Sequence, residues 1–180
     1  DGTTTAVPPI APCDINGAQH AGSAQVTRNS VLEYGPATSD CTIDAGDNTT
    51  RVTTSGNNFE FDGLNRYGGP TLAMRSYSAG CDAQQSKTQG TFSLTGYYGF
   101  DLPSSIPANY TVFVPGAKQS DPPMAKLVFS EIVPPPTQDG SQTFNLLHIT
   151  LFPQGGPASG DVYVGRIHCS VTGAAASPKA

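Results

Sequence analysis

The chain has 180 residues, which is enough for one domain with a hydrophobic core. Charged residues make up 13% of the chain, about half of the usual share, whereas its 20 glycines and 16 prolines are typical of a chain with many turns. The net charge is −5, the nine lysines and arginines are dispersed, and no apolar stretch reaches the roughly 18 residues of a membrane span, so the composition excludes a nucleic-acid-binding surface and a transmembrane helix.

The first twelve residues (DGTTTAVPPIAP) are rich in threonine and proline and give no helix signal. We predict that residues 1–12 form an extended N-terminal arm, in which Thr3, Val7 and Ile10 serve assembly. A single β-sandwich domain is expected at 13–173, followed by a C-terminal tail at 174–180.

The rest of the chain alternates short β-branched and aromatic runs with Gly, Pro, Asn and Asp, a rhythm typical of a sandwich or barrel. The only helix-compatible stretch, residues 81–87, has no apolar stripe. We therefore predict an all-β fold, an antiparallel β-sandwich with short strands, Pro/Gly-rich loops and two disulfides. In chain order the strands are expected at residues 22–28, 31–34, 41–44, 50–54, 58–61, 71–77, 91–100, 110–114, 125–133, 142–152 and 161–171.

The last two of these strands have the strongest patterns. In residues 142–152 (QTFNLLHITLF), Leu147 and Ile149 alternate onto one face and Phe144 and Leu146 onto the other, so both faces are apolar. This pattern predicts a central strand that is covered on both sides. In residues 161–171 (DVYVGRIHCSV) the apolar phase shifts at Gly165, which predicts a β-bulge there.

The four cysteines, Cys13, Cys41, Cys81 and Cys169, are widely spaced and form no C-x-x-C motif, which favours disulfides over a zinc or redox site. Three pairings are open. The order along the chain favours Cys13–Cys41 with Cys81–Cys169, and two such bridges indicate a secreted, extracellular protein.

The sequence contains no recognisable catalytic motif, and we predict that the protein is not an enzyme and uses no cofactor. Pairing of their strands could make His148 and His168 neighbours, but two histidines are too few for a catalytic zinc. The favoured interpretation is that His148 donates a ring N–H to a carboxylate such as Glu131 in a polar patch of a sheet. No metal site is predicted.

Two further features bear on an extracellular role. Asn48 and Asn109 are candidate glycosylation sites, because each begins an Asn-X-Thr tripeptide, although such tripeptides arise easily in a threonine-rich chain. Tyr97 and Tyr98 are candidate ligand contacts, since exposed aromatic rings stack on sugars. The chain has no tryptophan, which favours core packing for these aromatic residues.

The last third of the chain resembles the closing section of the actinobacterial secreted proteins called choice-of-anchor P. The segments LVFSEI, FNLLHITL and GDVYVGRIHCSVTG are similar to that family's L-N-E-Q strand, V-N-A-L-H-[VI] strand and A-D-V-[VI]-[VI]-G-x-x-x-C close. Ser130 and Leu146 depart from the pattern. The resemblance implies residence outside the cytoplasm, with the cell surface as a candidate location, and it implies no established activity. The matching positions are Glu131, Asn145, Leu147, His148, Gly165 and Cys169.

We hypothesise an extracellular structural or adhesive surface protein, whose copies assemble into an oligomer or filament when the arm of one adds as a β-strand to another. A cell-wall component is a further candidate partner. The alternative is a monomeric module that binds a carbohydrate or small ligand through Tyr97 and Tyr98.

Overall fold

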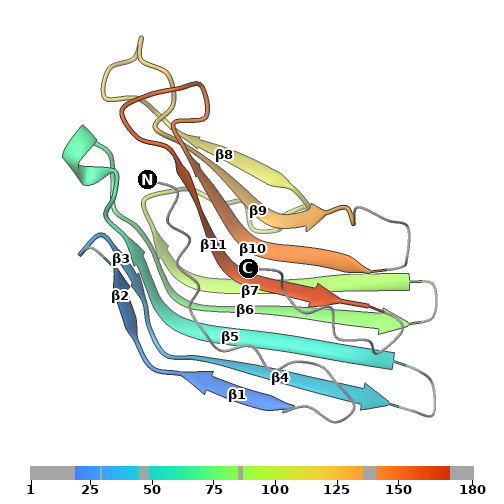
Figure 1. Cartoon of the computed structure of the whole chain (residues 1–180). Coiled ribbons are helices and arrows are strands. Elements are labelled where there is room, and N and C mark those ends of the chain that lie inside the picture. Colours follow the sequence, from blue (N-terminus) through green and yellow to red (C-terminus); the bar gives the residue numbers. More distant parts are fainter. Residues whose placement is uncertain (1–18, 29, 45–48, 85–86, 136–140, 171–180) are drawn as a thin grey trace.

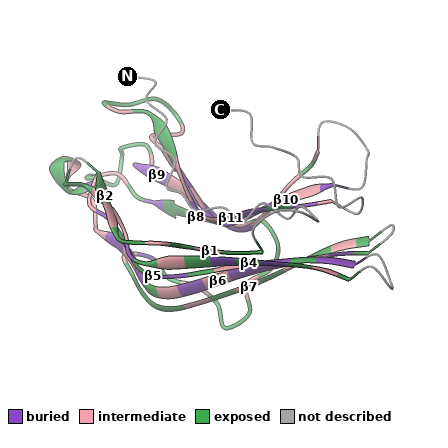
Figure 2. Cartoon of the chain, turned by 60° about the horizontal axis from the view of Figure 1, so that its bottom comes forward, coloured by how far each residue is buried: buried purple, intermediate pink, exposed green. Residues whose placement is uncertain are grey.

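The computed structural model describes residues 19–28, 30–44, 49–84, 87–135 and 141–170. Over these residues the chain forms two antiparallel sheets that pack as two layers (Figures 1 and 2), so the predicted all-β sandwich is confirmed. The assembly arm with Thr3, Val7 and Ile10, the cysteine at 13, the candidate sequon asparagine at 48 and the tail at 174–180 lie outside the described residues.

The larger sheet has seven strands, with β5 at its centre. One edge of β5 pairs first with β4 and then with β3, while its other edge pairs with β6, which in turn pairs with β7. Strand β1 extends the sheet beyond β4, and β2 extends it beyond β3. The strands are β1 (His20–Ser23), β2 (Val26–Arg28), β3 (Leu32–Tyr34), β4 (Ala37–Asp44), β5 (Thr49–Phe61), β6 (Leu72–Gln84) and β7 (Lys87–Tyr98).

The smaller sheet has four strands in the order β11, β10, β9, β8, so β10 is central, as the sequence predicts. Its strands are β8 (Tyr110–Val114), β9 (Ala125–Val133), β10 (Gln142–Leu151) and β11 (Gly160–Cys169). A single turn of 3₁₀ helix, Asn65–Tyr67, follows β5. No helix of the described residues has the length and apolar character needed to cross a membrane.

One hydrophobic core fills the space between the sheets. It combines Phe59 and Met74 of the larger sheet with Phe129 and Ile149 of the smaller one, all of which are almost fully buried. Burying side chains of this size contributes about 1.5–3 kcal/mol each, so the packing of the two sheets is the main source of stability.

A transverse distortion crosses the smaller sheet. At this level Leu146 of β10 lies opposite Ser130 of β9 and Gly165 of β11, as the residue pairs before and after it in the register show. Ser130 and Gly165 both have positive φ, 50° and 60°, in the left-handed region that L-residues rarely adopt. Because a residue in this conformation breaks the pleat, the side chains that follow change face relative to simple alternation.

The larger sheet has an equivalent distortion. Arg75 of β6 lies opposite Asn58 of β5 and Gly96 of β7, whose φ angles are 54° and 61°. Buried positions are even-numbered before it in β6, as at Met74, and odd-numbered after it, as at Tyr77. The long strands of this sheet curve visibly in Figure 1.

These distortions correct two predictions. Residues 142–152 do not carry two apolar faces, because the break at Leu146 brings Phe144 and Ile149 to the same core-facing side. The phase shift at Gly165 is real, but it is not a bulge with an extra residue, since Arg166 and Val164 keep one-to-one partners in β10. The neighbouring strands kink at the same level, which preserves the register.

Other strand predictions also differ from the structure. The strand expected at 22–28 is divided into β1 and β2, with residues 24–25 between them. The strands expected at 50–54 and 58–61 form one strand, β5, that runs through Gly56 and Asn57. Residues 81–84 of the helix-compatible stretch belong to β6, where cross-strand pairing with β5 and β7 outweighs local propensity.

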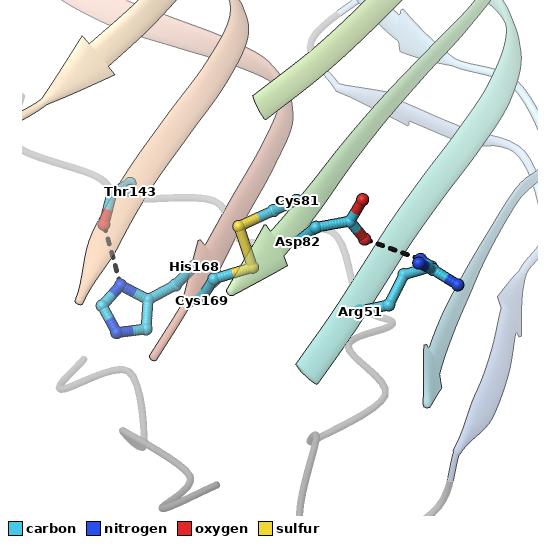
Figure 3. The surroundings of a disulfide bond; sticks show 6 residues. All are labelled: Arg51, Cys81, Asp82, Thr143, His168 and Cys169. Atoms are coloured by element: carbon cyan, nitrogen blue, oxygen red, sulfur yellow. Dashed lines mark hydrogen bonds and ion pairs between the residues drawn. A yellow bond between two sulfur atoms is a disulfide. The ribbon is translucent and has the colours of Figure 1, made fainter. Parts of the chain in front are cut away.

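A disulfide between Cys81 and Cys169 joins β6 to β11 and so links the two sheets, as predicted. Figure 3 shows it near the ends of both strands, next to the Arg51–Asp82 ion pair and the Thr143–His168 hydrogen bond. No described cysteine is a free thiol, and Cys41 is also disulfide-bonded.

Candidate functional site

The densest group of polar contacts lies on the face of the smaller sheet that points away from the core. It consists of Glu131, Asn145, His148, Thr150 and Asp161, which we call the carboxylate–histidine cluster. The kink at Leu146 places Asn145 and His148 on this same face although they are three positions apart. A regular strand would put them on opposite faces.

His148 is held on both sides by carboxylates. Its Nδ1 lies 3.0 Å from Oε1 of Glu131, which confirms the predicted contact, and its Nε2 lies 2.9 Å from Oδ1 of Asp161. An ionised carboxylate only accepts hydrogen bonds. Each ring nitrogen can therefore bond to its carboxylate only as a donor, and the tautomer decides which of the two does so.

An aromatic ring and a guanidinium group pack beside the cluster. Tyr163 stacks on His148 with a centroid separation of 4.4 Å, and the Arg166 guanidinium lies 4.9 Å from the Tyr163 ring centroid. The pKa of Tyr163 is raised mainly by burial and also by Asp161 and Glu131, while Arg166 acts in the opposite direction. These contacts leave the side chains of His148 and Glu131 less than one-fifth exposed.

The geometry of the cluster does not activate a nucleophile. Thr150 Oγ1 lies 3.4 Å from Nε2 of His148, but its hydroxyl donates to Asp161 at 2.9 Å. In a Ser/His/Asp triad the Nε2 atom must accept the proton of the nucleophile. Here Asp161 occupies that nitrogen, so His148 is not placed to act as a base for Thr150.

Asn145 is the most buried member, with 1% of its surface exposed. Its Nδ2 donates to Oε2 of Glu131 at 2.5 Å, whereas its Oδ1 has no hydrogen-bond partner in the described part of the chain. Glu131 thus accepts from two side chains at once and is the centre of the network.

Replacing Glu131 by glutamine is expected to lower the free energy of unfolding by about 2 kcal/mol. The glutamine amide has one acceptor oxygen, so it keeps the hydrogen bond from only one of Asn145 and His148, and the carboxylate's charge-assisted bond to the other is lost. Urea unfolding of both proteins measures the change.

Glu60→Gln is the matched control, because Glu60 lies on an exposed face directly across from Glu33. Its pKa is raised by partial burial and by the carboxylates of Asp62 and Glu33, so the ionised form is disfavoured and the glutamine should cost nothing. Equal losses in the two variants would contradict the role of the cluster.

The two histidines expected to be neighbours are not. Strands β10 and β11 do pair, but His148 faces Tyr163, and His168 faces Thr143, which comes five positions before His148 in β10. In the described ranges no group of three or more His, Cys, Asp or Glu side chains is arranged to hold a metal ion.

The aromatic pair sits at the end of β7. Tyr98 is 67% exposed, and Tyr97 is 42% exposed and stacks on Phe100 at 5.4 Å. Consecutive strand residues project to opposite faces, so the two tyrosines do not share one platform. Their role as ligand contacts stays a prediction.

Asn109 is exposed and occupies a left-handed turn with a φ of 58°. Its Oδ1 accepts the backbone N–H of Ile132 at 2.9 Å. A glycan would attach to Nδ2, so this hydrogen bond and a glycan are compatible, and glycosylation stays a prediction.

Strand β7 forms one edge of the larger sheet. It is 12 residues long and, among the described residues, pairs only with β6. Its one charged residue is Lys87, and it contains no proline. Beside it lies a pocket of about 450 Å³, bounded by β7, residues 104–106 and the kinked part of the smaller sheet.

Sequence reasoning identified Glu131 and His148 but missed Thr150, Tyr163 and Arg166. The register between β10 and β11 brings these residues next to His148, and the phase shift at Gly165 prevented that register from being predicted from the sequence. Three positions of the family resemblance, Glu131, Asn145 and His148, meet in the cluster. The resemblance itself stays a prediction: comparison of the chain with protein-family models, with curated proteins and with solved structures gives no match in any of the three.

Proposed function

We propose that the protein is an extracellular structural or adhesive subunit whose copies join by β-strand addition at the open edge of β7. The observation that carries this proposal is the character of that edge. Natural sheets protect their edges with charges, prolines, short strands or covering segments. Strand β7 has a single charge at its first residue, no proline and a length of 12 residues.

The edges formed by β1, β2, β8 and β11 are protected by comparison. Strands β1 and β2 have four and three residues, and β8 has five residues between Pro107 and Pro115. On β11 the backbone carbonyl of Tyr163 accepts the hydroxyl of Tyr34 at 2.9 Å. This contrast favours β7 as the acceptor of an added strand.

The proposed donor is the arm at residues 1–12 of another copy, and it is assigned from the sequence alone. Its segment TTTAV (residues 3–7) is uncharged and rich in residues that favour strands, which suits an uncharged acceptor edge. The Cys81–Cys169 disulfide is compatible with an extracellular location.

Sedimentation velocity and negative-stain electron microscopy of the full chain test the proposal. We expect concentration-dependent oligomers or filaments that disappear when residues 1–12 are deleted. The double variant Gln89→Lys/Thr91→Lys, on exposed positions of β7, should also give monomers because lysines on an edge oppose strand pairing.

Thr53→Lys/Ser55→Lys is the matched control, since both residues are exposed on the same face of the sheet but lie on the central strand β5. This control should assemble like the unaltered chain. A full chain that stays monomeric at high concentration, or assembly that survives both the deletion and the β7 lysines, would refute the proposal.

A further inference from the structure

The pocket beside β7 has a lining without charge. Gly90, Phe92, Ser93 and Leu94 come from β7, Ser104, Ser105 and Ile106 from the segment before β8, and Ser130 and Leu146 from the smaller sheet. Its volume, about 450 Å³, lies within the range of about 300–1,000 Å³ that is common for small-ligand sites.

The lining restricts the chemistry of an occupant. A charged ligand would lose its hydration without gaining a counter-charge, which is costly. The hydroxyls of Ser104, Ser105 and Ser130, each both donor and acceptor, instead match a ligand that carries several hydroxyl groups of its own. Phe92, Leu94, Ile106 and Leu146 add an apolar wall, against which the C–H face of such a ligand can pack.

Ser130 gives the most specific indication. It is only 6% exposed and lines the pocket from the smaller sheet, where its hydroxyl can donate to or accept from an occupant. Its φ is 50°, a conformation that glycine adopts without strain, as Gly165 does on the other side of Leu146. Neither the fold nor the sheet ladder therefore requires a serine side chain at this position.

We propose that this pocket binds a neutral sugar unit, with the Ser130 hydroxyl as its innermost hydrogen-bonding group. The proposal does not depend on strand addition at β7, and it places the sugar in a different location from Tyr98. A sugar site is also what an adhesive surface protein would use to hold a glycan-bearing partner.

Saturation-transfer difference NMR on the full chain tests this proposal, because it observes the sugar and tolerates large assemblies. The probes are glucose, galactose, mannose and N-acetylglucosamine, with glucuronate as the charged comparison. We expect transfer to at least one neutral sugar and none to glucuronate.

Ser130→Gly should weaken binding about fivefold, the value of one neutral hydrogen bond, while the protein stays folded. Ser30→Gly is the matched control: it makes the same change at a φ of 52°, at an exposed position away from the pocket, and should leave binding unchanged. Ser104→Ala/Ser105→Ala, in an exposed segment, should weaken binding as well.

Three outcomes would overturn the proposal. The first is an absence of transfer to every neutral sugar. The second is binding that Tyr98→Ala abolishes and Ser130→Gly leaves intact, which would assign the sugar to the end of β7. The third is transfer to a synthetic peptide of residues 1–12 in place of the sugars, which would assign the pocket to strand addition.

Discussion

Replacing Cys81 and Cys169 together by alanine is expected to lower the free energy of unfolding by about 4.5 kcal/mol. The cysteines are 88 residues apart, and a cross-link over a loop of that length removes a large amount of conformational entropy from the unfolded chain. It also joins the two sheets directly, so its loss leaves their association to core packing and to contacts such as the Tyr34–Tyr163 hydrogen bond. Urea unfolding of the double variant measures the change.

The single variants Cys81→Ala and Cys169→Ala provide the control for this prediction. Each should already show most of the loss, and the two losses should not add, because both remove the same covalent bond. Variants are preferable to a reductant, which would also act on the disulfide of Cys41. A loss below about 1 kcal/mol in the double variant would contradict the prediction.

Gly165→Ala is expected to lower the free energy of unfolding by about 3 kcal/mol, which combines two costs. The φ of 60° is unfavourable for any residue with a Cβ, and that Cβ would lie 2.9 Å from the Cβ of Leu146. Neither atom belongs to a flexible side-chain end, so the strands themselves would have to move.

Gly155→Ala separates the two costs. Gly155 also has a positive φ, 89°, but a Cβ there would meet nothing within 4 Å. Only the backbone cost of about 1 kcal/mol should remain in this variant. If both alanines cost the same in urea unfolding, the close approach to Leu146 contributes nothing and the explanation fails.

The sequence predicts the strands well where alternation is uninterrupted. The bounds expected for 110–114 and 125–133 coincide with β8 and β9, because prolines flank both segments and end the pairing. The middle of β5 was missed, since Gly56 and Asn57 are typical of turns and are held in the strand by β4 and β6 on either side.

The kinks show where sequence reasoning reaches its limit. A phase shift revealed the break at Gly165, but the break at Ser130 has no sequence signal, because serine is not a residue that favours positive φ. When neither break is taken into account, simple alternation assigns the apolar residues of β10 to two faces. The contact between Glu131 and His148 could be predicted from residue types alone. The contact between Asp161 and His148 could not, because it depends on the register between β10 and β11.

The disulfide also sets how the protein responds to mechanical load. If the chain is pulled from points outside residues 81–169, the segment enclosed by the bridge cannot lengthen, even after both sheets have separated. Extended chain spans about 3.4 Å per residue, so about 300 Å of potential length is locked. A subunit under shear at a surface would therefore yield over a short distance and then resist further extension through a covalent bond.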